Sequence, residues 1–404
     1  MKYKQLNILL ISIMYSSIIG LFAFLFLRVE ATLTHFLWYT LKDKINTYNI
    51  LYNFVLIFIG TIFLLFIKKR YGDVPQNHHE VDNNFKNNGS IGNYNIIQNT
   101  ISALVVLVVG AGVGPEATLM GILYGMSIWQ ADKARYIFQN YENFIDINLN
   151  RKLEILFHPT KYLNSKTTQN TLKREKLLSV LLIINGIIIY LLLSNLVNAP
   201  GFITKIGNID NVIKTIPYAL PIVPVVIITG FLYTVVNKQI EKFINSSYTI
   251  NQKIILGGIV IFLIATFAHN LLFSGQHTMN LVVDMALQLS AIFLFLSAII
   301  KLLFLSICLN TGWKGGDIFP LMFSAFLQGY AWSVIFPEAN STVMISIIAT
   351  TFLITVSKQD IVALIVISLF FPINALPVII VFGGLAITIK RFVKTKIKNF
   401  LIYN

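Results

Sequence analysis

Two glycine-containing segments interrupt long apolar runs of this sequence, and each leads directly into another apolar run. The first segment, residues 109–118, reads VGAGVGPEAT, and the second, residues 310–320, reads NTGWKGGDIFP. Glycine allows the backbone to turn sharply, and proline is favoured at the first position of a helix. Each segment therefore predicts a backbone turn that ends at the N-terminus of a helix.

Such helix starts are suited to binding small anions. The first four N–H groups of a helix have no partner inside the helix, and the helix dipole adds about half a positive charge. Two starts that converge from the two halves of the chain would replace part of an anion's hydration shell, without a buried Lys or Arg that would hold the ion too tightly. The predicted anion-binding residues of the two segments are Gly114, Pro115, Gly315, Gly316, Asp317, Ile318, Phe319 and Pro320.

Glu116 is the candidate gating residue. It is the only acidic residue between Ile97 and Gln130. A carboxylate in such an apolar stretch is costly unless it meets a helix N-terminus or becomes protonated. It could therefore occupy the anion site in place of the ion, and leave it when protonated. The alternative is that Pro115 and Glu116 are the favoured first-turn residues of an ordinary helix.

Asp317 has a simpler interpretation as a helix cap. Asp is a preferred N-cap residue, and a cap would satisfy the free amides of the following helix without any role in transport. We favour the cap over a second gate. Lys314, three residues earlier, could offset the negative charge of Asp317.

The composition of the chain excludes a soluble protein. Of 404 residues, 56% are hydrophobic and 12% charged, against roughly 25% charged residues in a typical soluble domain. Cys308 is the only cysteine, which excludes a disulfide scaffold. The net charge of +14 is explained by cytoplasmic loops and anionic lipid headgroups. We expect no nucleic-acid partner.

Ten apolar runs predict an all-α polytopic membrane protein with some broken or re-entrant helices. The run 6–27 is longer than the apolar part of a cleaved signal peptide, so we expect a retained anchor. The last run contains Pro372 and Pro377, which predict a kink or a turn. The ten runs are residues 6–27, 50–67, 97–114, 177–197, 219–237, 254–268, 285–300, 318–336, 343–357 and 361–389.

Three polar segments complete a single predicted membrane domain that spans residues 1–404. They are a polar loop at 71–95, a basic loop at 131–176 and a basic tail at 390–404. The basic loop and both termini are expected in the cytoplasm of a cell whose plasma membrane holds the protein. No motif of a cofactor site, a metal site or an enzyme is found, so we expect neither cofactor nor catalysis.

The sequence resembles the CLC family of chloride channels and proton-coupled chloride antiporters. Residues 114–118 (GPEAT) are similar to the family segment that carries the external gating glutamate. Residues 311–320 (TGWKGGDIFP) are similar to the segment that contains Gly-x-Phe-x-Pro. Residues 71–75 (YGDVP) weakly resemble the family's Gly-Ser-Gly-Ile-Pro. The resemblance implies a homodimer in which each subunit is an inverted repeat with its own anion pathway.

The resemblance also assigns roles to individual residues. Glu116 becomes the gate, and the amides of Asp317 and Ile318 become anion ligands. Gly72 takes the place of the family's coordinating serine, with Asp73 beside it. The family's coordinating tyrosine and its internal proton-accepting glutamate have no counterpart that we find, and no C-terminal nucleotide-binding domain is expected.

We therefore expect membrane transport of a small anion, most simply chloride, by a channel or a proton-coupled antiporter gated by Glu116. The expected partners are the anion, protons if transport is coupled, membrane lipids and a second copy of the chain. A fluoride- or nitrate-selective exchanger is one alternative. The other alternative is a membrane interaction subunit that transports nothing and uses its basic loop to contact a partner or lipid.

Overall fold

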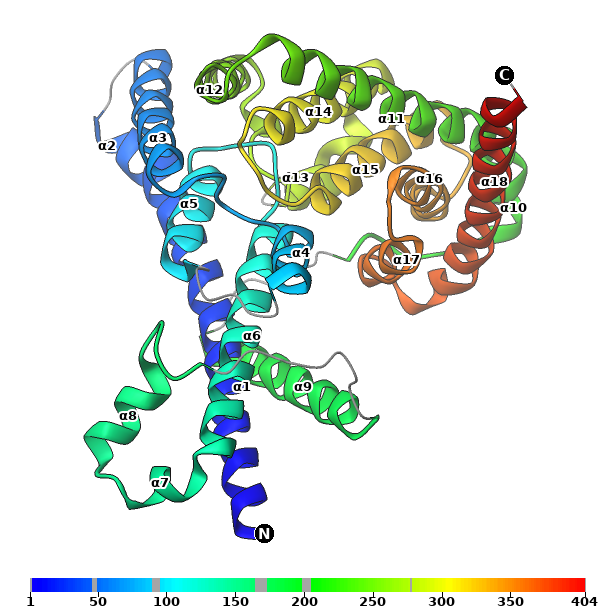
Figure 1. Ribbon diagram of the computed structural model, residues 1–404. Helices are drawn as coiled ribbons and strands as arrows, with labels where there is room; N and C mark the ends of the chain where they lie inside the picture. Colours follow the sequence, from blue (N-terminus) through cyan, green and yellow to red (C-terminus); the bar gives the residue numbers. More distant parts are fainter. Residues whose placement is uncertain are drawn as a thin grey trace. The chain divides into compact units, whose positions relative to one another are not determined.

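The structure, a computed structural model, describes the chain apart from residues 1, 46–48, 89–94, 164–172, 198–204, 277 and 404. The described residues form helices joined by short turns (Figure 1). The chain divides into two compact units. The first unit comprises residues 1–47, 66–108 and 115–200, and the second comprises residues 48–65, 109–114 and 201–404. The predicted organisation as one membrane domain remains a prediction.

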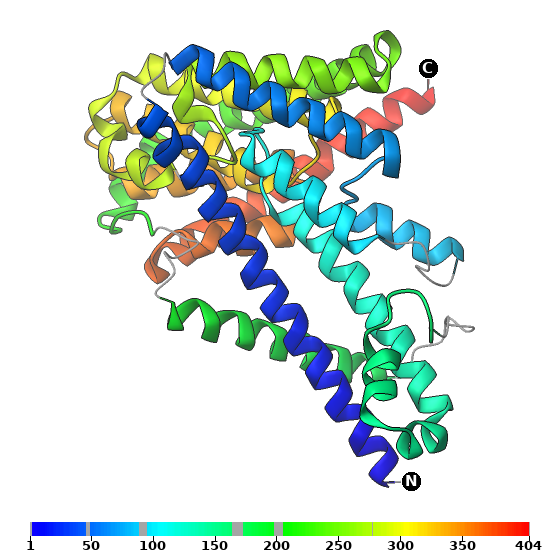
Figure 2. The same cartoon turned by 90° about the vertical axis from the view of Figure 1, so that its left-hand side faces the viewer.

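A long N-terminal helix organises the first unit. This helix, α1, packs against α6 and α9 (Figure 2). Its backbone lies very close to that of α9 at Gly20, where an added β-carbon would be only 2.3 Å from the carbonyl oxygen of Gly186. The helices of this unit are α1 (Lys2–His35), α2 (Leu41–Ile45), the end of α3 (Asn49–Tyr71), α4 (His78–Asn88), α5 (Ile96–Val108), α6 (Glu116–Gln139), α7 (Tyr141–Asp146), α8 (Leu149–Phe157) and α9 (Lys173–Leu196).

The second unit is built around the buried helix α16. Fourteen of the sixteen residues of α16 are buried, and the helix packs against α11, α15 and α18. The helices of this unit are most of α3, α10 (Val212–Ala219), α11 (Ile222–Ser247), α12 (Ile250–Phe267), α13 (Met279–Met285), α14 (Ala291–Asn310), α15 (Ile318–Ile335), α16 (Ser341–Val356), α17 (Asp360–Leu369) and α18 (Leu376–Tyr403).

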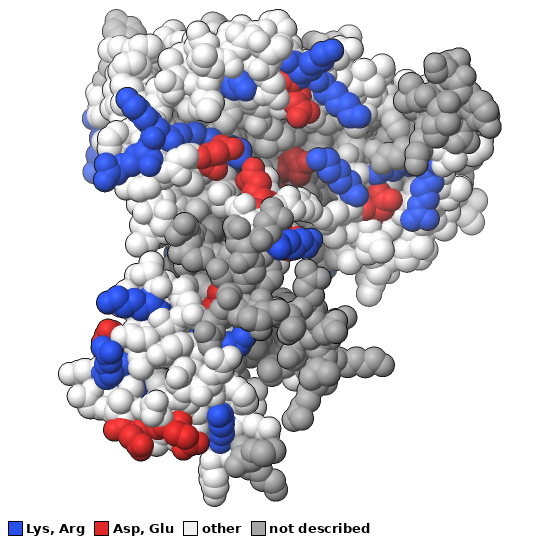
Figure 3. Space-filling view, viewed as in Figure 1, with Lys and Arg blue, Asp and Glu red and all other residues white. Residues whose placement is uncertain are grey.

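Several helices are long and apolar enough to cross a membrane. Among the described residues there are seven, residues 3–45, 49–71, 222–247, 250–267, 291–310, 318–335 and 373–393. Many apolar side chains on these helices are exposed, and Figure 3 shows wide areas without acidic or basic groups. Apolar surface on this scale is suited to contact with lipid. The predicted break at Pro372 is also present, because α17 ends at Leu369 and α18 starts at Leu376.

Three of the sequence predictions need correction. The basic segment 131–176 is not a loop throughout, because α6 continues to Gln139 and α7 and α8 follow it. The polar segment 71–95 is not a loop throughout, because α4 occupies residues 78–88. Asn77 and Glu80 start this helix by exchanging backbone-to-side-chain hydrogen bonds of 2.8 and 3.0 Å, which form a capping box. The run predicted at 285–300 also ends too early, because α14 continues through Lys301 to Asn310. Lys301 is fully buried, so its charge does not mark the end of the apolar helix.

Candidate functional site

The two glycine segments meet in the second unit. Gly114 donates its N–H to the carbonyl of Gly316 at 2.8 Å, and Gly316 donates to the carbonyl of Gly114 at 2.6 Å. A β-carbon on Gly315 would lie 2.3 Å from Cγ2 of Val113. A side chain at position 315 would press against Val113 and against the carbonyl oxygen of Gly114, 3.0 Å from the β-carbon. The two segments are therefore paired at Gly114 and Gly316, while the convergence of the two helix starts on an anion remains a prediction.

The first of the two turns that precede this pair is buried, and the second is partly buried. Gly110 and Gly312 have φ angles of 100° and 87°, a conformation that favours glycine. The N–H of Gly112 points at Sγ of Cys308, 3.4 Å away, and a β-carbon on Gly112 would lie 2.6 Å from the ring of Phe304. Packing against α14 therefore holds the first turn in place.

A tryptophan anchors the second turn. Trp313 is fully buried, and its indole N–H donates to the carbonyl of Ile254 on α12 at 3.0 Å. A buried indole needs such a partner because an unpaired N–H is costly away from water. Gly257 of α12 makes room for the ring, since a β-carbon there would lie 2.3 Å from the indole.

Helix α15 starts directly after the glycine pair. Asp317 occupies its N-cap position, as predicted, but the carboxylate makes no capping hydrogen bond. The φ and ψ angles of Asp317 are −104° and −16°. A capping side chain usually needs an extended backbone to reach the N–H groups two or three residues further along the chain, so this conformation leaves the cap unformed. Ile318 is the first residue of α15, Phe319 packs edge-on against Phe370 at a centroid distance of 6.4 Å, and Pro320 is buried.

Helix α6 follows the first segment along the chain. Pro115 takes the N-cap position with φ −72° and ψ −19°, and Glu116 is the first helical residue. The side chain of Glu116 is half-buried. This position is compatible with both interpretations of Glu116, as a gating residue and as an ordinary first-turn residue of α6. Its role therefore remains a prediction.

Gly72 and Asp73 form a turn in the first unit. Gly72 has φ 80°, and its N–H donates to the carbonyl of Lys68 at 2.9 Å, which ends α3. The Asp73 carboxylate forms an ion pair of 3.1 Å with the ammonium of Lys68, which is almost fully buried. The structure therefore gives Asp73 the local task of balancing a buried cation. Anion binding by Gly72 and Asp73 remains a prediction.

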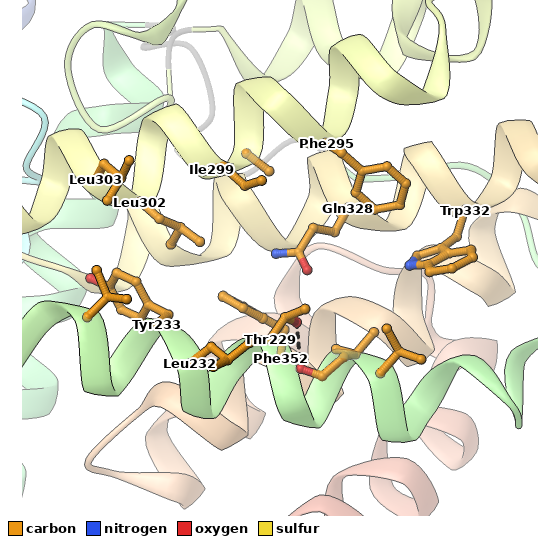
Figure 4. A pocket seen from close by; sticks show the side chains of 14 residues that line it. Thr229, Leu232, Tyr233, Phe295, Ile299, Leu302, Leu303, Gln328, Trp332 and Phe352 are labelled. Atoms are coloured by element: carbon orange, nitrogen blue, oxygen red, sulfur yellow. Dashed lines mark hydrogen bonds between the residues drawn. The ribbon is translucent and has the colours of Figure 1, made fainter.

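The second unit also contains a cavity of about 280 Å³ between helices α11, α14, α15 and α16. Its walls are mostly apolar, with Thr229, Tyr233, Gln328 and Trp332 as polar exceptions (Figure 4). The Thr229 hydroxyl is already engaged, since it donates to the carbonyl of Val226 at 2.8 Å. An apolar cavity offers a small anion little compensation for its lost hydration, so the paired glycine turns remain the better candidate site.

The described residues offer no site for a metal ion formed by three or more His, Cys, Asp or Glu side chains. The polar chemistry of the candidate site is that of backbone amides at glycine turns and helix starts. Such groups bind anions without a cofactor.

These features define a class of protein. Apolar spanning helices, together with broken backbone segments that carry paired glycines ahead of helix starts, are typical of membrane channels and transporters. The sequence profile of the voltage gated chloride channel family matches residues 167–391, more than half of the chain. The chain belongs to this family, whose members move anions across membranes, and it is a multi-pass membrane protein.

Two solved structures share the fold. A CLC-type fluoride/proton antiporter is 12% identical with a TM-score of 0.62, over 96% of each chain. A slow cyanobacterial Cl⁻/H⁺ antiporter is 14% identical with a TM-score of 0.66, over 94% of each chain. The predicted fold class, an all-α membrane protein of the CLC type with broken helices, is confirmed. No curated protein matches the sequence.

Proposed function

We propose that the protein carries chloride across the plasma membrane through a site at the paired glycine segments, as a channel or as a proton-coupled antiporter. The mutual hydrogen bonds of Gly114 and Gly316 carry this proposal. They fix Gly316, two residues before the first residue of α15, and Gly114, two residues before Glu116. The amide of Ile318 would then bind the anion, because the Asp317 side chain does not cap this N-terminal turn. The amide of Asp317 would join it once it is released from its own carboxylate, which accepts from it.

In this proposal Glu116 competes with the anion for the site. Its carboxylate would close the pathway when ionised and open it when protonated. Gly72 and Asp73 would contribute to the same pathway at the position where the family has a coordinating serine. The proposed protein is a homodimer with an anion pathway in each subunit, and both termini and the basic segment 131–176 lie in the cytoplasm.

Fluoride is the second candidate substrate. Gly72 brings no side-chain hydroxyl, and open space surrounds the position of its absent β-carbon. The similar fold of a fluoride/proton antiporter supports this candidate. Fluoride is smaller and more strongly hydrated than chloride, so a change in the coordinating groups is expected to alter the preference between the two ions.

Anion efflux from liposomes tests the proposal. The purified protein is reconstituted, and the efflux of chloride, fluoride and nitrate is compared while the external pH is recorded. Chloride efflux with proton movement in the opposite direction indicates an antiporter, and efflux without proton movement indicates a channel. Faster efflux of fluoride or nitrate than of chloride would identify that anion as the substrate in place of chloride. Absence of flux from folded protein contradicts transport and favours the interaction subunit.

A further inference from the structure

A buried lysine lies behind the paired glycine turns. Lys301, in the middle of α14, has no exposed surface. Its ammonium donates to the carbonyl of Leu271 at 2.9 Å and to the carbonyl of Phe273. It also lies 5.5 and 5.9 Å from the ring centroids of Phe304 and Phe323. A cation at this depth of an apolar helix is costly and therefore calls for an explanation.

Three contacts connect Lys301 to the first glycine turn. Phe273, whose carbonyl accepts from Lys301, donates its own N–H to the carbonyl of Gly110 at 3.4 Å. The Phe304 ring next to the ammonium also packs against Gly112. Cys308, one helical turn further along α14 than Phe304, is within electrostatic reach of Lys301 and accepts from the N–H of Gly112. The positive charge is thus adjacent to the backbone that leads to Gly114.

A second buried lysine of the same unit, Lys390, has a charge partner that Lys301 lacks among the residues that the structure describes. Lys390 on α18 also donates to two main-chain carbonyls, those of Ile354 and Ser357. Its charge is balanced by the Asp360 carboxylate at 2.7 Å. Within the described part of the chain, no carboxylate pairs with Lys301. The groups that contact its ammonium among the described residues are carbonyls and ring faces.

We infer that Lys301 in its protonated form is an electrostatic positioning residue of the anion site, and that its charge favours a bound anion in front of the Gly110–Gly114 turn. This inference rests on the proposed function. Both donated hydrogen bonds point at carbonyls, so the lysine acts through its potential and does not bind the ion directly. An anion held by backbone amides remains exchangeable, while the nearby cation raises its local concentration in a medium where charges are poorly screened.

Anion binding by neutral variants tests the inference. The full-length protein in detergent is titrated calorimetrically with sodium chloride and with sodium fluoride. Lys301→Met removes the charge, Lys301→Gln removes the charge but keeps hydrogen-bond donors, and Lys301→Arg keeps the charge. We expect the Kd to rise roughly tenfold in both neutral variants and to recover in the arginine variant.

Lys390→Met is the matched control, because it removes a buried lysine of similar contacts from another helix. It should lower the melting temperature and leave the Kd of the folded protein unchanged. A Kd that stays at the wild-type value in Lys301→Gln, or that rises equally in Lys390→Met, overturns the inference. Wild-type protein that binds neither anion overturns the proposed function, and the inference with it.

A variant that keeps Lys301 covers the case in which both neutral variants fail to fold. Cys308→Asp places a carboxylate within reach of the ammonium and so balances its charge in place. Cys308→Ser is the neutral control. We expect weaker anion binding in Cys308→Asp alone, and equal Kd values in the two variants would contradict the electrostatic role.

Discussion

Gly315 and Val113 are in contact across the two glycine segments, at a distance that leaves no room for a β-carbon. The nearest Val113 atom would be 2.3 Å from a β-carbon at position 315, and the carbonyl oxygen of Gly114 would be 3.0 Å away. The first obstacle is a side-chain atom, but the second is backbone that cannot rotate away. The pairing of the two segments therefore depends on the absence of a side chain at this position.

Gly315→Val should accordingly separate Gly114 from Gly316. We expect anion flux through liposomes to fall by about tenfold or more, because the amides of the site lose their fixed positions. Gly384→Ala is the control, since a β-carbon at this position of α18 would have no other atom within 4 Å. Unchanged flux in a folded Gly315→Val protein would show that the pairing is not needed for transport.

Glu116→Gln should mimic the protonated gate. We expect anion flux that stays open and loses most of its dependence on external pH, because glutamine cannot ionise. Efflux is measured between about pH 4 and pH 8, a range that includes the ordinary pKa of a glutamate. Glu142→Gln is the control, an exposed residue of α7. If Glu116→Gln keeps the pH dependence of the parent, Glu116 is an ordinary residue of the first turn.

Asp317→Ala should cost little folding stability, because the Asp317 carboxylate makes no capping hydrogen bond. Asn340→Ala is the comparison, since the side chain of Asn340 accepts from the N–H of Val343 at 3.0 Å at the start of α16. We expect about 1 kcal/mol of destabilisation for Asn340→Ala and less than about 0.5 kcal/mol for Asp317→Ala. Urea unfolding in detergent measures both. Equal losses would mean that Asp317 acts as a cap after all.

Asp132 should make stability depend on pH. It lies near the C-terminal end of α6, outside the candidate spans, and burial raises its pKa to about 6 although Arg135 is 3.0 Å away and opposes the shift. The folded protein then holds the Asp132 proton more tightly than the unfolded chain does. The stability that this proton contributes is complete below the unfolded pKa of 3.8 and is lost as the pH rises through 6.

Asp132→Asn removes this titration. We expect the melting temperature of the variant to exceed that of the parent by more at about pH 8 than at about pH 5, because only the parent loses stability between these values. The melting curves of the two proteins at both pH values measure the difference. A gap that is the same at both values, or larger at the lower pH, would contradict the raised pKa.

Much of the fold could be predicted from the sequence because its signals are local. Runs of apolar residues mark the spans, and Pro372 lies at the break between α17 and α18. The glycine segments could also be recognised, because a glycine cluster inside an apolar run indicates a backbone turn between two helices. Their pairing followed only from the general expectation that two helix starts share an anion, and the structure provides it as two hydrogen bonds.

Other features depend on contacts that are distant in sequence. Lys301 looks like the end of a span, and only the carbonyls of Leu271 and Phe273, far earlier in the chain, show why it is buried. The side chain of Asp317 has the right type for a cap, but its backbone is not extended, and it directly follows the paired Gly316. Composition carries no information about such contacts.

The burial of α16 has a consequence for how this chain can vary. Residues on every side of the helix are enclosed, including Ser346, Thr350 and Thr351, which are fully buried. A larger side chain on any face would push against a neighbouring helix, because protein interiors leave few voids. Substitutions by larger residues should therefore destabilise the protein at every position around α16. On the lipid-facing helices, one side of each helix should tolerate almost any apolar residue.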